Sequence, residues 1–187
     1  MRHASIIATA AGAAFLAACS PQDGNQAVDK AQDAVSAPVG QTSAVVMGGN
    51  LVSAYVPAAA MGDMYEIQAA DIALDRSARA DVKALAQMIK TDHTAASAAF
   101  KTAAATAAPG VALPTDLDER RKGLVDNLRS AGVADFDKVY IDQQVAAHQE
   151  AVTLHRGFAD NADAPALAAH ARHVQPVHRG LLVRVHF

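Results

Sequence analysis

From Asn50 onward, apolar residues recur at intervals of three and four positions, which is the spacing of an amphipathic α-helix. This pattern predicts four helices, which cover residues 51–77, 80–107, 115–132 and 135–159. Thr115 and Asp116 are expected to cap the third of these helices. Because the connections are short, neighbouring helices are expected to run antiparallel. The pattern therefore predicts an all-α fold, an antiparallel four-helix bundle with a short extra helix.

Proline positions bear on where two of the helices begin and end. Pro57 would delay the start of the first helix. Asp163 and Pro165 are expected to open a fifth helix, which Pro176 interrupts. Composition also favours helices, because about a quarter of the 187 residues are Ala and only 4% are aromatic. A β-sandwich or β-barrel is therefore disfavoured.

The N-terminal residues carry the features of an export signal. Residues 1–3 are a short basic segment, and residues 4–18 are almost all small or apolar. This run is shorter than the ~20 apolar residues that span a bilayer, and it is typical of a secretory signal peptide. The segment LAAC at residues 16–19 resembles a bacterial lipobox, in which the signal is removed before the cysteine and the cysteine is acylated. We therefore expect Cys19 to anchor the protein in a lipid bilayer.

These features predict three parts of the chain: a signal peptide (1–18), a lipidated cysteine with a flexible tether (19–49), and a helical domain (50–187). The tether is rich in Ser, Gln, Asp, Gly and Pro, and it has too few large apolar groups to form a core. Ser20 follows the cysteine where an Asp would favour the inner membrane of a Gram-negative cell. We therefore expect a lipoprotein on the periplasmic side of a bacterial membrane, with the outer membrane favoured.

Charge and motif content narrow the classes of partner and chemistry. The chain has 16 Lys and Arg against 19 Asp and Glu, a net charge of −3, and it has no basic stripe that would favour nucleic acid as a partner. A single cysteine excludes an internal disulfide and a cysteine-based zinc site. Neither a G-x-S-x-G motif nor a glycine-rich phosphate loop is present, so hydrolase chemistry is not indicated. No feature specifies a protein partner.

Three ionisable side chains fall on the apolar faces of three different predicted helices. Glu66 lies in a seam of small residues, and His93 shares a stripe with Ile89 and Phe100. His148 lies in the middle of the apolar stripe of the fourth helix. We expect these three groups to be able to meet at one level of the bundle.

Two further residues border these stripes. Asp92 lies about 100° around the helix from its neighbour His93 and can still reach a seam between helices. His155 is nearer the end of its helix, and we expect it to be exposed to solvent.

Two interpretations of the inward polar groups stay open. They can hold the helices in register through buried hydrogen bonds, or they can bind one transition-metal ion such as Zn, Cu or Fe.

Three segments resemble the DUF4142 family of bacterial exported proteins, many of them lipoproteins without a settled activity. The matching motifs are G-x-x-x-E-I at 62–67, the Asp92-His93 pair, and FDKVYIDQQVAAH at 136–148. The resemblance covers about residues 53–177, and it implies a ferritin-like helical bundle. It also implies that Glu66, Asp92, His93 and His148 occupy the recurrent polar positions of the family.

The C-terminal part departs from the family pattern. Members usually carry Leu-Pro and a further His five residues after that proline, whereas here Gln175 precedes Pro176 and the fifth residue onward is Leu181. A further ligand from this part of the chain would therefore have to be a substitute. The candidates are His170, His173 and His178.

The residues favour a protein without catalytic activity. Ferritin-like di-metal sites use Glu-x-x-His pairs, and none occurs in the chain, so a di-iron oxidase is disfavoured. The first hypothesis is a membrane-anchored binding module, or an envelope- or stress-related module. The alternative is a single-site metal-binding protein in which Glu66, His93 and His148, with or without Asp92, hold one transition-metal ion.

Overall fold

The computed structural model describes residues 50–185, with side chains to residue 181. The predicted signal peptide (1–18) and the predicted lipidated cysteine and tether (19–49) lie outside the described residues. Throughout the described part, all regular secondary structure is helical. The five helices are α2 (Val52–Arg76), α3 (Ala80–Ala107), α4 (Glu119–Ser130), α5 (Phe136–Phe158) and α6 (Pro165–Val185). Three of them, α2, α3 and α5, begin and end within about two residues of the bounds predicted from periodicity.

The start of α4 differs from the prediction. Asp118, rather than Thr115 or Asp116, is the N-cap, and its carboxylate accepts a hydrogen bond from the Arg121 backbone N–H at 2.8 Å. Asp116 instead accepts a hydrogen bond from the Leu117 backbone N–H and forms an ion pair with a lysine. The helix therefore begins three residues later than a cap at Thr115 requires, and two residues later than a cap at Asp116 requires.

Neither internal proline breaks its helix. The predictions that Pro57 delays the first helix and that Pro176 interrupts the last were wrong, because α2 begins at Val52 and α6 continues past Pro176. Proline removes one backbone hydrogen bond from a helix. Pro176 is exposed, so the carbonyl it leaves unpaired faces solvent, while Val174 and Leu181 bury the opposite side of the helix.

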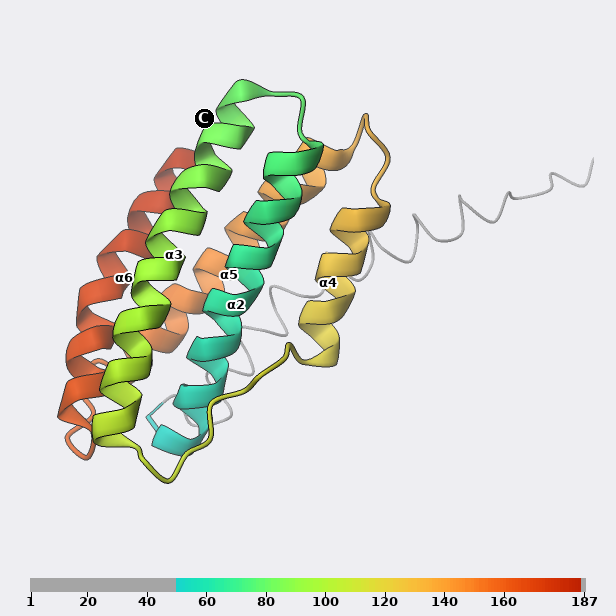
Figure 1. The fold of residues 1–187 in the computed structure, drawn as a ribbon. Coiled ribbons are helices and arrows are strands. Elements are labelled where there is room, and N and C mark those ends of the chain that lie inside the picture. The colour runs from blue at the N-terminus through green and yellow to red at the C-terminus, as the bar shows by residue number, and fades with distance from the viewer. Residues whose placement is uncertain (1–49, 186–187) are drawn as a thin grey trace, which may run out of the picture.

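The four long helices form a closed ring of contacts. Helix α2 packs against α3 and α5, and α6 packs against the same two helices (Figure 1). Residues 77–79 join α2 to α3, and residues 159–164 join α5 to α6, so each pair is an antiparallel hairpin. Between the hairpins the chain crosses over through α4, which lies on α2 and α5. As a result, α3 and α5 run in the same direction at diagonal positions of the ring (Figure 1).

Arg76 fastens the crossover helix to the end of α2. Its guanidinium donates to the backbone carbonyl of Leu128, to that of Arg129 at 2.8 Å and to that of Ala131 at 2.6 Å. These carbonyls lie at the C-terminal end of α4, where helical partners are missing and a positive charge is favourable. The same guanidinium lies 4.8 Å from the ring centre of Phe136. Arg76 therefore joins the ends of α2 and α4 to the start of α5.

Two apolar clusters fill the interior, and a layer of buried polar side chains separates them. One cluster contains Ile89 and Tyr140, and the other contains Phe100 and Leu154. On α3 the residue between the clusters is His93, and on α5 and α6 the corresponding residues are His148 and His178. The polar residues therefore lie at the middle of the bundle, with apolar packing on both sides.

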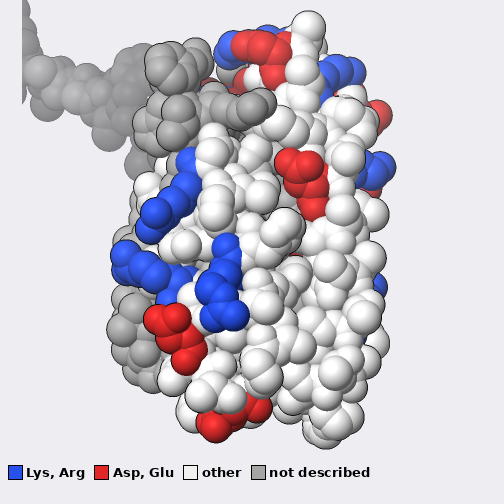
Figure 2. All heavy atoms as spheres, turned by 90° about the vertical axis from the view of Figure 1, so that its left-hand side faces the viewer, with Lys and Arg blue, Asp and Glu red and all other residues white. Residues whose placement is uncertain are grey.

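The outer surface that α3 and α6 form carries few charged side chains (Figure 2). Figure 2 shows the face that these two helices form, most of which is uncharged, with basic and acidic groups both present. Among the described residues, no helix combines the length and the apolar character needed to cross a membrane.

Candidate metal centre

His93 projects from α3 into the polar layer and is held from α2. The side chain is 3% exposed, and its Nδ1 lies 2.9 Å from the Oδ1 of Asp63. A carboxylate accepts hydrogen bonds, so Nδ1 carries a proton, and in the neutral ring Nε2 keeps its lone pair. That Nε2 is buried without a hydrogen-bond partner. Asp63 therefore fixes the tautomer of His93 and leaves one nitrogen available.

His148 on α5 has the same tautomer for a different reason. Its Nδ1 donates to the backbone carbonyl of Gln144, one turn earlier, at 2.8 Å. The Oε1 of Glu66 lies 3.5 Å from the same Nδ1, so the α2 carboxylate is close to the protonated edge of the ring. The Nε2 of His148, like that of His93, is buried without a partner. The lone pair of this imidazole is therefore also available.

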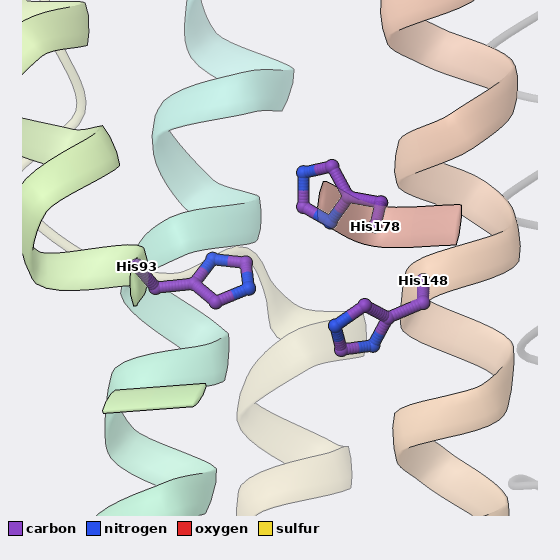
Figure 3. Close-up of side chains that lie close together, drawn as sticks. All are labelled: His93, His148 and His178. Atoms are coloured by element: carbon purple, nitrogen blue, oxygen red, sulfur yellow. The ribbon is translucent and has the colours of Figure 1, made fainter. Parts of the chain in front are cut away.

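His178 on α6 brings a third ring to the same place. It is 4% exposed, and its Nδ1 is buried without a partner. The ring centres of His93, His148 and His178 lie 5.2–5.7 Å apart, and one nitrogen of each ring lies within 4.8 Å of the other two. In Figure 3 the rings point from their three helices toward a common space.

The surroundings of two buried histidines, His178 and His155, favour the neutral form of the ring. Burial lowers the pKa of His178 well below its usual value, and the neighbouring histidines lower it further. Burial lowers the pKa of His155 to about 3. Burial also lowers the pKa of His93, but the hydrogen bond to Asp63 and the charge of Glu66 outweigh burial, and the net shift is upward. Metal ligation needs the neutral ring, which the lowered pKa values of His178 and His155 favour.

His155 and His170 extend the layer toward one end of the bundle. The prediction that His155 is exposed was wrong, because the ring is 5% exposed and its Nδ1 lies 2.9 Å from the Tyr55 hydroxyl. Tyr55 also stacks on Phe158 with ring centres 3.8 Å apart, and this packing covers the end of α5. His155 in turn stacks on His178 with ring centres 5.1 Å apart. The buried histidines therefore form one continuous group.

A cavity of about 610 Å³ reaches this layer. Its lining includes the buried side chains of Glu66, His93 and His178. The remaining walls come from α2, α4 and α5, and many of them are Ala or Gly. The three-histidine group is thus bordered by space in which a small molecule fits.

The sequence profile of a family described as a domain of unknown function (DUF4142) matches residues 40–186. The chain belongs to this family. Comparison with the curated proteins and with the solved structures gave no significant match. The motifs at 62–67, 92–93 and 136–148 that resemble the family all lie within the matched region.

The DUF4142 domain brings some of the predicted site residues together and leaves others apart. Glu66, His93 and His148 meet at one level, with Glu66 beside the three-histidine group rather than within it. Of the three C-terminal candidates, His178 joins the group. His170 is buried against Phe100, and His173 is exposed. Asp92 is half-buried and lies outside the group.

One residue of the DUF4142 site was missed from the sequence. Asp63 lies three positions before Glu66 on α2, so both carboxylates point to the same side of that helix. It is 8% exposed and partners His93. The i, i+3 spacing of two acidic residues at a seam of small residues was the signal that would have identified it.

Proposed function

We propose that this domain binds one divalent transition-metal ion through Nε2 of His93, Nε2 of His148 and Nδ1 of His178. The observation that carries the proposal is that these three nitrogens are buried without hydrogen-bond partners, on rings that each place one nitrogen within 4.8 Å of the other two. A buried polar atom left unpaired costs about 1–3 kcal/mol, so native proteins pair nearly all of them. One metal ion would satisfy three such atoms at once.

The three imidazole donors favour a metal ion that is intermediate between hard and soft. Imidazole nitrogens suit Zn, Cu, Fe, Co and Ni, and three of them in a buried site disfavour Mg or Ca. In a tetrahedral site with ligand bonds of about 2.05 Å, the nitrogens lie about 3.3 Å from one another. The three rings would therefore close by up to about 1.5 Å around the ion. Side-chain rotation supplies such a shift.

The groups behind the ligands also support the proposal. Metal-bound histidines commonly donate the second ring N–H to a carboxylate or a backbone carbonyl. Here Asp63 takes that role for His93, and the Gln144 carbonyl takes it for His148, with Glu66 close by. We assign Glu66 to this supporting role because it lies at the Nδ1 edge of His148, away from Nε2. Glu66 as a direct ligand remains the alternative that the sequence favoured.

We also propose that the fold is a ferritin-like four-helix bundle. Two antiparallel hairpins joined by a single long crossover support this assignment, because ferritin-like bundles have one such crossover. The domain differs from di-iron members of that class in its ligands, since Glu-x-x-His pairs are absent from the sequence. A single metal ion fits the three-histidine group better than a pair.

The third part of the proposal concerns location. We infer that the protein is a periplasmic lipoprotein anchored through Cys19, with the outer membrane favoured, on the evidence of the LAAC segment at residues 16–19 and the preceding apolar run. Radiolabelled palmitate should enter the protein in cells, and Cys19→Ser should abolish labelling and release the protein from the membrane fraction. Labelling that persists in Cys19→Ser would show that the anchor is wrong.

Elemental analysis of the untagged protein tests the metal site. We expect close to one transition-metal ion per chain, and we expect His148→Ala or His178→Ala to remove it. His173→Ala is the matched control, because His173 lies on the same helix as His178 but is exposed. Metal content near zero before and after these changes, with a loss of thermal stability only, would instead support a structural or protein-binding envelope module.

A further inference from the structure

The cavity next to the three histidines suggests what the metal ion would do. We propose that the ion keeps one coordination position open to this cavity, and that a small neutral molecule with a nitrogen donor and an apolar body binds there. This inference rests on the proposed metal site. It assigns a ligand class to that site and a route by which the ligand arrives.

The number and position of the protein ligands leave one position free. Zinc and related ions take four ligands, and sites with three protein ligands bind an exogenous molecule in the fourth position. The cavity is lined by His93 and His178 but not by His148, so it borders the group on one side. Glu66 also lines the cavity, but its Oε1 lies 3.5 Å from the protonated nitrogen of His148, behind the ligand edge.

The walls of the cavity set the character of the ligand body. Most of their surface area is apolar, and the small or apolar residues among them include Ala58, Ala59, Gly62, Ala146, Ala147 and Leu154. The volume of about 610 Å³ lies within the range of small-molecule pockets, roughly 300–1,000 Å³. An apolar body would release water from these walls, which is favourable.

The charges near the ion favour a neutral donor. The ligand rings would be neutral, and the carboxylates of Asp63 and Glu66 together balance the two positive charges of a divalent ion. An anionic ligand would therefore leave a net negative charge in a buried site, which is costly. The guanidiniums of Arg120 and Arg121, which also line the cavity, are held by Glu150 at 2.7–2.9 Å. Arg121 also pairs with Asp118, so two carboxylates balance these two guanidiniums.

Gly62 offers a way to close the cavity without touching a ligand of the ion. It lies within α2 and lines the cavity, and a Cβ built on it meets no atom within 4 Å. Leucine at this position would extend into the open space, and it is a better helix former than glycine. Gly180 on α6 is the matched control, because it is exposed and a Cβ there also meets nothing within 4 Å.

The test uses the full-length protein in detergent, Co²⁺ as a visible probe of the ion, and imidazole and azide as neutral and anionic ligands. We expect a one-to-one Co²⁺ complex whose visible spectrum changes saturably with imidazole, and azide to bind at least about tenfold more weakly. In Gly62→Leu, Co²⁺ binding should stay while imidazole affinity falls at least about tenfold. Gly180→Leu should match the parent protein in both measurements.

The outcomes separate the two proposals. If Co²⁺ does not bind, the metal site itself is wrong. If Co²⁺ binds and imidazole leaves its spectrum unchanged, the open position is wrong and the metal site stands. Imidazole binding that survives both Gly62→Leu and Ala58→Leu would overturn the cavity as the route. Azide binding as tight as imidazole binding would overturn the neutral ligand class.

Discussion

Asp63 on α2 accepts a hydrogen bond from His93 on α3 at 2.9 Å, with both side chains buried. The carboxylate orients the ring and increases the basicity of its free nitrogen, and such partners typically raise metal affinity by about 10–100-fold. We therefore predict that Asp63→Ala weakens Zn²⁺ binding by about 10–100-fold, measured by competition with a chromophoric chelator.

The control for this prediction is Asp71→Ala. Asp71 lies on the same helix but is exposed and pairs with Lys90, so its removal should leave Zn²⁺ affinity unchanged. Equal losses in the two variants would mean that the effect comes from the net charge of α2 rather than from the Asp63–His93 hydrogen bond.

Metal removal should lower the stability of the folded domain. A ligand that binds only the folded state at 100 times its Kd stabilises that state by about 2.7 kcal/mol. We therefore predict that Zn²⁺ at this concentration raises Tm by about 10 °C, and that a chelator reverses the rise. Differential scanning calorimetry measures both. In His178→Ala the Zn²⁺-dependent rise should disappear, and a full rise in that variant would exclude His178 as a ligand.

The metal-free protein should lose stability in mild acid. Burial lowers the pKa of His155 to about 3, and it lowers the pKa values of His170 and His178 as well. In the unfolded chain these residues titrate near pH 6.5, so below that pH the unfolded state binds protons that the folded state does not. The free energy of unfolding therefore falls as the pH drops, by about 2 kcal/mol for His155 alone at pH 5.

His93 acts in the opposite direction. Its pKa is raised in the folded state, so its contribution is present below about pH 6.5 and is lost as the pH rises through the folded value. One such residue offsets only part of the three lowered ones. Urea unfolding of the metal-free protein at pH 7 and pH 5 measures the sum. Equal stabilities at the two pH values would contradict the prediction, and His173→Ala should leave the difference intact.

We expect Arg76 to stabilise the folded domain by holding the C-terminal end of α4 against α2. It donates to three backbone carbonyls at the end of that helix, and hydrogen bonds to charged groups are worth about 1.5–3 kcal/mol. We predict that Arg76→Ala lowers the free energy of unfolding by about 2 kcal/mol, measured by urea titration. Arg129→Ala, which removes an exposed side chain paired with Asp126, should change it by less than about 0.5 kcal/mol.

Helix positions were predictable because burial repeats with the helical period. Val82, Ile89, His93 and Phe100 are all buried along α3, as their spacing indicated. The start of α4 was harder to place, because acidic residues at 116 and 118 are both able to cap a helix. Asp118 is the residue that caps α4, and the choice between the two depends on the conformation of the preceding segment, which the local sequence does not determine. Continuation past Pro176 depends on which side of α6 faces solvent, and that is a tertiary property.

The candidate site also has residues that helix periodicity predicted and residues that depend on tertiary packing. The positions of Glu66, His93 and His148 followed from the apolar stripes of their own helices. The choice among His170, His173 and His178 depends on how α6 is rotated against α3 and α5, and local spacing does not determine that rotation. His178 and Leu181 lie three positions apart on one side of α6. Leu181, where the resemblance implies a histidine, is a core residue here, and His178, one turn earlier, faces the other rings.

The crossover through α4 has a consequence for how the two hairpins hold together. His93 belongs to the first hairpin, and His148 and His178 belong to the second. The chain has one cysteine, so a disulfide bond is not available to join the hairpins. An ion held by all three rings would act as a reversible cross-link between distant parts of the chain, and its loss would leave the packing of α2 on α5 and of α3 on α6 to hold the hairpins together.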